Sequence, residues 1–215
     1  MSNLKKYGKN QGKVNFIRFI MFLVTAVVIG AAAFGGYKFL MPKVVALQKD
    51  WKQKKIMKEK EEQKKEEDKK IAAMEGGVNF NGHTYKAFEE GKTWTEAKEY
   101  CESVGGHLAI VETEEEQLFL EGILKEKNLY WIGLAHVKEE WLWVNGEPLN
   151  YAKWSGEGPD NFTGEENYAA MYNYPNPKNG NSDPGEWNDT QEDGECNGEE
   201  FFGKENIGFL CEWDM

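Results

Sequence analysis

The sequence predicts an α+β domain with a long loop region, preceded by an apolar segment and a highly charged helix. Within the domain, helical patterns come early and short strand patterns come late, an order typical of α+β folds. Seven of the eight tryptophans lie beyond residue 76. Such a share of large aromatic side chains favours a compact core in that part of the chain.

Charge divides the chain into two parts. The first 76 residues carry 17 Lys and Arg against 8 Asp and Glu, whereas the remaining residues carry 9 against 29. The acidic part would repel phosphates, which are bound by cations, so nucleic acid is excluded as a partner. Clustered carboxylates can attract a hard cation such as calcium, although a solvated acidic surface accounts for the same composition.

The amino-terminal residues resemble a membrane anchor. A basic segment over 1–18 precedes an uncharged run over 19–37, close to the roughly 20 residues that a helix needs to cross a bilayer. We therefore expect a transmembrane helix over 19–40, a cytoplasmic tail over 1–18 and an extracytoplasmic domain. A cleaved signal peptide is the alternative, but the run exceeds the roughly 7–15 apolar residues of such a signal.

Residues 43–74 are rich in Lys, Glu and Gln and contain no Gly or Pro. These residue types favour helix, and pairs such as Glu61 and Lys65 have i,i+4 spacing. An apolar stripe begins at Leu47 and Trp51 and then gives way to charge, which predicts a coiled-coil-like stalk, solvated over most of its length and roughly 48 Å long. A disordered charged linker is the alternative. Self-association through the stalk or the transmembrane helix stays open.

The domain is expected over 77–215, with helix and strand patterns separated by turn signals. Asn145-Gly146 predicts a tight turn between two strands, and Thr113 with Glu116 predicts a capping box at a helix start. A stretch rich in Gly, Asn, Pro and Asp follows the turn. We expect helices over 93–104 and 113–124, and strands over 83–88, 130–134, 141–144 and 207–213.

Four short motifs occur in order along this domain. They are Cys101 with Gly105-Gly106-His107-Leu108-Ala109, then Trp131-Ile132-Gly133-Leu134, Trp187-Asn188-Asp189 and Phe209-Leu210-Cys211-Glu212. In this order they resemble the C-type lectin-like domain family, over about residues 80–213. The resemblance implies the C-type lectin-like fold, with two helices, short antiparallel strands and a long loop region.

The resemblance also implies a disulfide between Cys101 and Cys211. Closing a loop of about 110 residues would stabilise the domain by roughly 4–5 kcal/mol, and the bond needs an oxidising compartment. The second disulfide usual in the family is absent, because Tyr168 stands where one partner would be. Cys196 is therefore expected to be a free thiol.

In the family, carboxylates and amides of the loop region bind one calcium ion and share their other atoms with sugar hydroxyls. The resemblance gives these roles to Asp160, Glu166, Asn188 and Asp189. Calcium takes about six to eight oxygen ligands, so these side chains would fill part of its coordination shell. The family's proline in this motif, here Pro159, is commonly cis.

One position departs from the family pattern. Gly158 stands where the family has Glu or Gln before the proline, so one ligand and one sugar contact are missing. Glu157, one position early, or a water would have to substitute. Otherwise calcium or sugar binding is weakened or lost.

The resemblance implies calcium-dependent glycan binding by a membrane-anchored domain. The alternative is a protein-binding or adhesion module that uses the same fold without calcium, for which Gly158 is the best support. No metalloprotease helix, nucleophile elbow or phosphate-binding glycine loop is visible, so no enzyme is expected. The three histidines are not expected to form a metal triad, and His107 is interpreted as structural.

Overall fold

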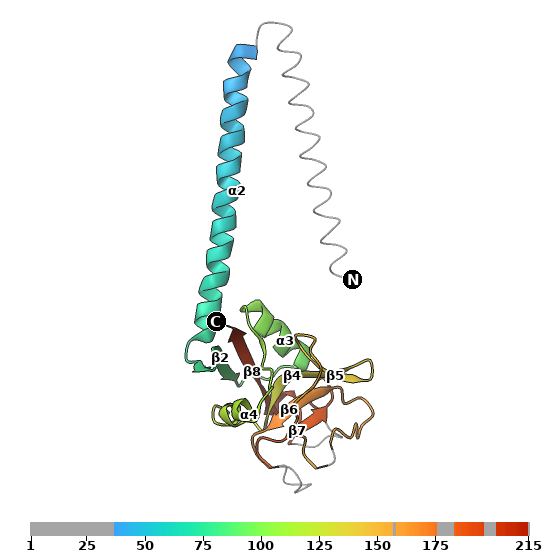
Figure 1. The fold of residues 1–215 in the computed structure, drawn as a ribbon. Helices are drawn as coiled ribbons and strands as arrows, with labels where there is room; N and C mark the ends of the chain where they lie inside the picture. The colour runs from blue at the N-terminus through green and yellow to red at the C-terminus, as the bar shows by residue number, and fades with distance from the viewer. Residues whose placement is uncertain (1–36, 157, 176–182, 196–200, 215) are drawn as a thin grey trace. The chain divides into compact units, whose positions relative to one another are not determined.

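The structure, a computed structural model, describes residues 37–156, 158–175, 183–195 and 201–214. The chain up to Gln63 and the chain from Lys64 onward form two compact units (Figure 1). The expected membrane span over 19–40 lies outside the described residues apart from its last four. In the described ranges, no helix combines the length and the apolar character needed to cross a bilayer.

Helix α2, Tyr37–Met74, contains the segment expected as a stalk and begins six residues earlier. Its surface carries i,i+4 ion pairs, such as that between Asp50 and Lys54 at 2.8 Å. Such pairs stabilise a solvated helix only slightly, because both side chains stay in water. The apolar stripe is exposed, since Leu47 and Trp51 are 69% and 57% accessible to solvent.

The described residues of the second unit form one eight-stranded sheet with two α-helices and a short 3-10 helix. The strand order is β1-β2-β8-β4-β6-β7, with β3 paired to β8 and β5 paired to β4. The strands are β1 (Val78–Phe80), β2 (His83–Phe88), β3 (His107–Leu108), β4 (Leu129–Val137), β5 (Glu140–Trp143), β6 (Tyr168–Tyr172), β7 (Trp187–Thr190) and β8 (Ile207–Asp214). The helices are α3 (Trp94–Ser103), α4 (Glu114–Glu121) and η1 (Lys204–Asn206).

The last strand of the domain lies in the middle of the sheet. β8 pairs antiparallel with β2 over six residue pairs, from His83 opposite Asp214 to Phe88 opposite Phe209. It also pairs antiparallel with β3 and parallel with β4. Residues from the start, middle and end of the domain therefore meet on one strand (Figure 1).

Apolar side chains cover both faces of this sheet. In β4, Leu129 and Trp131 belong to one buried cluster, whereas Tyr130 and Ile132 belong to the other. All four side chains are fully buried. A strand buried on both faces is a continuous apolar run rather than an alternating one, which explains the sequence pattern over 130–134.

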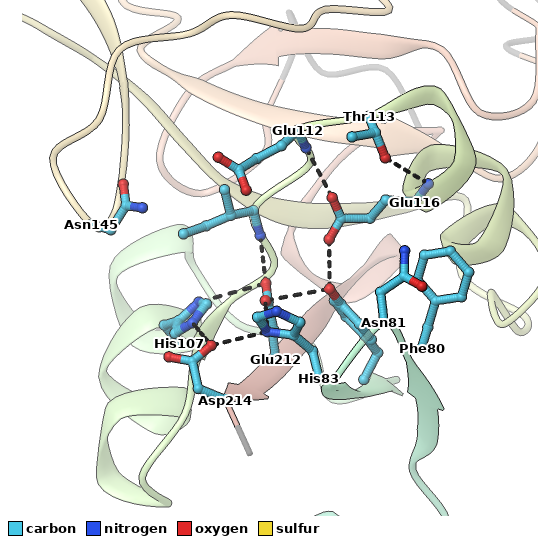
Figure 2. A pocket seen from close by; sticks show the side chains of 12 residues that line it. Phe80, Asn81, His83, His107, Glu112, Thr113, Glu116, Asn145, Glu212 and Asp214 are labelled. Atoms are coloured by element: carbon cyan, nitrogen blue, oxygen red, sulfur yellow. Dashed lines mark hydrogen bonds and ion pairs between the residues drawn. The ribbon is translucent and has the colours of Figure 1, made fainter.

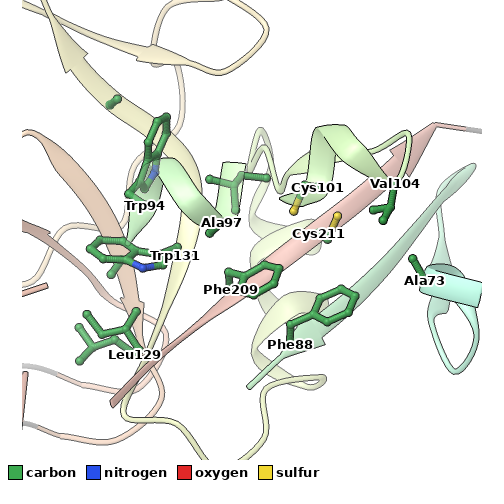
Figure 3. Packing of buried hydrophobic residues seen from close by; sticks show 14 of the residues in the cluster. Ala73, Phe88, Trp94, Ala97, Cys101, Val104, Leu129, Trp131, Phe209 and Cys211 are labelled. Atoms are coloured by element: carbon green, nitrogen blue, oxygen red, sulfur yellow. The ribbon is translucent and has the colours of Figure 1, made fainter. Parts of the chain in front are cut away.

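Cys101 and Cys211 are separate thiols in the structure, so the disulfide expected between them is not formed there. Both side chains are fully buried. They come from α3 and β8, and Figure 3 shows their sulfur atoms pointing toward one another. The two thiols share a side-chain hydrogen bond, and their burial raises the pKa of the Cys211 thiol. The helix and the strand are therefore joined at this point by packing and by that hydrogen bond.

Two helix predictions need correction. The second helix ends at Glu121 rather than at residue 124, because Gly122 caps it. The reciprocal capping box lies at the other helix, where Thr93 Oγ1 accepts from Glu96 N–H and Glu96 accepts from Thr93 N–H. At Thr113 only the first of these two bonds forms, since the Glu116 carboxylate accepts from Glu112 N–H instead.

The glycine of the Trp-Ile-Gly-Leu motif yields a prediction. A Cβ at Gly133 would lie 2.7 Å from the carbonyl oxygen of Leu108 and 3.1 Å from that of Ala109, both backbone atoms. We expect Gly133→Ala to lower the free energy of unfolding by about 1–3 kcal/mol, the usual cost of overpacking. Urea denaturation measures it. Gly122→Ala is the control, because its Cβ would approach a backbone oxygen less closely, at 3.3 Å from the Phe119 carbonyl. An equal loss in both variants would contradict the packing argument.

Candidate functional site

Three carboxylates that are distant in the sequence converge beside β7. One oxygen each from Asp160, Glu166 and Asp189 lies within 4.8 Å of the other two. Asp160 and Glu166 belong to the long loop between β5 and β6, and Asp189 belongs to β7. Glu166 and Asp189 are only 3% and 2% exposed, whereas Asp160 is on the surface. The fold thus brings together three of the four predicted ligand residues.

Trp187 fixes the strand that carries Asp189. Its side chain is fully buried, and its indole N–H donates to Gln117 Oε1 at 2.8 Å. Trp143, Tyr151 and Trp154 surround it with edge-on ring contacts at centroid distances of 5.8–5.9 Å. Edge-on pairs of this kind add stabilisation beyond the area that they bury. The start of β7 is therefore a rigid support for the residues that follow it.

The long loop is bonded directly to this support. The Trp187 N–H donates to the Lys153 carbonyl at 2.7 Å, and the Ser155 N–H donates to the Trp187 carbonyl at 2.9 Å. Farther along the loop, the Asp189 carboxylate accepts from the backbone N–H groups of Asp160 at 3.2 Å and Asn161 at 2.8 Å. Asp189 therefore holds in place the turn from which Asp160 projects.

Asn161 closes the turn from the other side. Its side-chain oxygen accepts from the Glu166 N–H at 3.0 Å, and its backbone has a left-handed φ of 46°. Asparagine tolerates this conformation better than most residues because its short amide bonds locally. The Asn161 amide and the Asp189 carboxylate thus hold the Asp160 and Glu166 carboxylates close together.

Two of these carboxylates, Glu166 and Asp189, are poorly stabilised as anions. Burial raises the pKa of Glu166, and the neighbouring Asp189 charge raises it further, while backbone N–H groups of Thr163 and Phe162 offset part of the effect. Burial also raises the pKa of Asp189, against the lowering effect of its hydrogen bonds to Asn161 and Asp160. Converging oxygens with excess negative charge and little water are a donor set that fits a hard divalent cation.

The remaining predictions for this site concern Asn188, the Gly158–Pro159 bond, Glu157 and Cys196. The Asn188 side chain donates through Nδ2 to the backbone carbonyl of Asp189, so its nitrogen is engaged at the end of the strand. The Gly158–Pro159 bond is cis, as the resemblance implied. A Cβ at Gly158 would lie 3.0 Å from the Ser155 carbonyl oxygen, so the backbone is closely packed where the family has a side-chain ligand. Glu157 and Cys196 lie outside the described residues.

A second group of ionisable side chains lines a cavity of about 330 Å³ (Figure 2). It lies at the end of the β2–β8 pair where His83 is opposite Asp214, a place called the β2–β8 edge below. His83, Glu212 and Asp214 meet there, with His107 beside them. Sequence reasoning missed this group, because only the strand register places His83 opposite Asp214 and His107 opposite Glu212.

The charge of the first site yields a prediction about pH. With a chelator present, we expect Glu166→Gln to raise the free energy of unfolding at pH 7. A carboxyl whose folded pKa is raised costs stability that grows as pH rises above its unfolded pKa and is complete above the raised pKa, and Gln removes the charge. The gain should disappear as pH falls below the raised pKa, where Glu166 is protonated. Urea denaturation at pH 7 and pH 4 measures it.

Glu165→Gln is the matched control, because this neighbour is exposed. A loss of stability in Glu166→Gln at both pH values would mean that its hydrogen bonds outweigh the charge repulsion.

Comparison with known proteins places the domain in a family. The "Lectin C-type domain" family profile matches residues 90–200. The chain is 37% identical to mouse asialoglycoprotein receptor 2 over 93 residues, covering 41% of this chain and 30% of the receptor. It is 30% identical to mouse CD209 antigen-like protein A over 138 residues, covering 62% of this chain and 52% of that protein. The match therefore spans about half or less of these relatives.

A solved structure agrees with these matches. The mouse scavenger receptor C-type lectin carbohydrate-recognition domain aligns with a TM-score of 0.51 and 28% identity, over 64% of this chain and 95% of that domain. It shares the fold of this chain, and the names of these relatives are those of a receptor, an antigen-like protein and a carbohydrate-recognition domain rather than of enzymes. The chain is accordingly not an enzyme, and it belongs to the C-type lectin domain family.

Proposed function

We propose that the chain binds glycans through calcium held beside β7. The observation that carries the proposal is the convergence of Asp160, Glu166 and Asp189 within 4.8 Å, two of them almost fully buried. Burial and then repulsion from Asp189 raise the pKa of Glu166, and a cation between these carboxylates would offset both effects. The names of the relatives, an asialoglycoprotein receptor and a carbohydrate-recognition domain, support the same function.

Asp160, Glu166 and Asp189 would hold the ion, with the Asn188 side-chain oxygen as a fourth donor. When bound, a calcium ion in such a shell offers its remaining positions to two vicinal sugar hydroxyls. Asp189 has a second role, because its carboxylate accepts from two backbone N–H groups of the turn that carries Asp160. The loop is consequently shaped in part before any ion arrives.

Phe162 would give the site an apolar contact. Its ring is 71% exposed, although it is a large hydrophobic residue. Its backbone N–H donates to the Asp160 side chain at 3.2 Å, so the ring follows directly after a proposed ligand. A sugar ring has an apolar face of C–H groups, which can pack on an exposed aromatic ring while its hydroxyls reach the ion.

Gly158 favours a second candidate function, protein binding without calcium. The close approach of the Ser155 carbonyl leaves little space for the longer side chain usual in the family. The ion would then have one side-chain donor fewer than in the family pattern. A fold alone does not decide between the two functions.

We also propose that residues 19–40 anchor the chain in a membrane, with 1–18 in the cytoplasm, 43–74 as the stalk and 77–215 outside. The extracytoplasmic side is where a Cys101–Cys211 disulfide would form. The exposed Leu47 and Trp51 of α2 would allow two chains to associate along their stalks.

Calcium titration of the full chain by calorimetry tests the main proposal. We expect saturable binding that falls at least about tenfold in Glu166→Ala and Asp189→Ala, each of which removes a proposed ligand. Glu165→Ala is the matched control, because its side chain is exposed beside Glu166. A glycan array with and without chelator then tests the sugar. Phe162→Ala should weaken glycan binding and leave calcium binding unchanged.

The absence of heat at millimolar calcium would overturn the calcium mechanism. Glycan binding that survives the chelator would do the same. Calcium binding without any glycan signal would overturn the glycan part of the proposal. The absence of both calcium binding and a glycan signal would favour the protein-binding alternative.

The disulfide is tested by counting thiols. In chain recovered from an oxidising compartment and denatured without reductant, we expect one reactive thiol, Cys196, out of three. Cys101→Ala with Cys211→Ala should lower the free energy of unfolding by up to roughly 4–5 kcal/mol relative to the oxidised chain. Cys196→Ser is the control and should leave stability unchanged. Three reactive thiols would show that the buried pair stays reduced.

A further inference from the structure

The side chains at the β2–β8 edge include nitrogen as well as oxygen donors. His83 Nδ1 lies 2.9 Å from Glu212 Oε1 and 3.0 Å from Asp214 Oδ1. One donor atom from each of these three residues lies within 4.8 Å of the other two. His107 lies beside them, with Nε2 3.7 Å from Asp214 Oδ1. Figure 2 shows the two imidazole rings and the two carboxylates facing one another.

The sheet register holds these donors. His83 is directly opposite Asp214 in the β2–β8 pair, and His107 is directly opposite Glu212 in the β3–β8 pair. Glu212 and Asp214 are two residues apart on β8, so their side chains lie on the same face of the sheet. Positions on paired strands are more rigid than loop positions, which suits a site that must keep its geometry.

Glu212 is held with one oxygen toward His83. Its side chain is almost entirely buried, and Oε2 accepts from the Ile110 N–H at 2.9 Å. Oε1 faces His83 and lies 3.3 Å from the Tyr85 hydroxyl, which also bonds to Glu116 at 2.5 Å. Glu212 therefore has a fixed orientation and an oxygen available to a further partner.

His107 is oriented by the backbone. Its Nδ1 lies 2.9 Å from the carbonyl oxygen of Leu108. With the Nδ1–H donated to that carbonyl, Nε2 keeps its lone pair on the side of Asp214. Histidines that bind metals almost always donate their other ring N–H to a carbonyl or carboxylate in this way.

His83 Nδ1 lies close to two carboxylates without a well-aligned hydrogen bond to either. This nitrogen is buried and makes no hydrogen bond, although two carboxylate oxygens lie within 3.0 Å. A protonated imidazole that formed an ion pair would direct its N–H at one of these oxygens. A cation placed between the nitrogen and the two oxygens would give all three atoms a well-aligned partner.

We propose that this cluster binds a divalent transition metal of the Zn²⁺ class. The ligands are His83 Nδ1, Glu212 Oε1 and Asp214 Oδ1, with His107 Nε2 in the fourth position. Mixed imidazole and carboxylate donors suit zinc, whereas calcium selects oxygens alone. A tetrahedral zinc with ligands at about 2.0–2.1 Å separates its donor atoms by about 3.3 Å. His83 Nδ1 is 2.9 Å from Glu212 Oε1 and 3.0 Å from Asp214 Oδ1, and His107 Nε2 is 3.7 Å from Asp214 Oδ1. These distances lie on both sides of that value.

The metal would act as a clamp on the sheet. Its ligands come from β2, β3 and β8, so one ion would join strands from the beginning and the end of the domain. The adjoining cavity of about 330 Å³ gives the ion a path from solvent. This proposal does not depend on calcium or glycan binding, because it shares no residue with the site beside β7.

The test is zinc titration of the metal-free full chain by calorimetry, in millimolar calcium so that oxygen-only sites are filled. We expect one zinc per chain, an increase in the midpoint of thermal unfolding, and at least about tenfold weaker binding in His83→Ala and Asp214→Asn. Asp214 is 72% exposed, so Asp214→Asn should fold even if His83→Ala does not. His136→Ala, at the third histidine of the chain, is the matched control.

Cobalt substitution identifies the ligands. Co²⁺ bound by nitrogen and oxygen gives weak visible bands, whereas thiolate ligation by a cysteine adds a strong near-ultraviolet band, which we do not expect. Zinc affinity that is unchanged in both variants, or no zinc binding at all, would overturn the proposal. The cluster would then be a set of histidine–carboxylate ion pairs.

Discussion

The pairing of β8 with β2 is the constraint on which the rest of the domain depends. Six residue pairs join the last strand to one of the first, and β8 also pairs with β3 and β4. This arrangement places Phe209 against Phe88 at a centroid distance of 4.9 Å and Cys211 beside Cys101. The two buried clusters and the histidine–carboxylate group all follow from that one register.

The two candidate sites use opposite means of holding their donors. Beside β7, a loop without regular structure is positioned by the Asp189 carboxylate and the Asn161 amide. Only Asp189 of the three carboxylates lies on a strand. At the β2–β8 edge, three of the four donor residues lie on strands β2 and β8 and the fourth on β3. Loops tolerate sequence change better than paired strands do, so the loop site is the one whose chemistry can vary while the fold stays the same.

The sequence predicts the parts of the fold that rest on local patterns. The helix at 93–104 and the strands near 131 and 209 could be predicted from periodicity and motifs, and they are present. A turn is also present at Asn145-Gly146, where the Gly146 N–H donates to the Trp143 carbonyl. Strand β6 could not, because Tyr168–Tyr172 is apolar throughout and lies in a stretch dominated by loop residues. The resemblance to the C-type lectin-like domain family predicted Asp160, Glu166 and Asp189 as ligands of the site beside β7. His83 and His107 carry no signal of their own, since their neighbours exist only once β8 is paired.

The central position of β8 also has a consequence for synthesis. Ribosomes synthesise the chain from its amino terminus, so β2, α3 and β4 emerge before β8, the strand that joins them. Until β8 emerges, β2 is paired only with β1, and β4 lacks its parallel neighbour. Pairings between residues more than a hundred positions apart also form slowly. The domain therefore cannot complete its core before β8 has been synthesised, and a chain that lacks β8 exposes apolar surface.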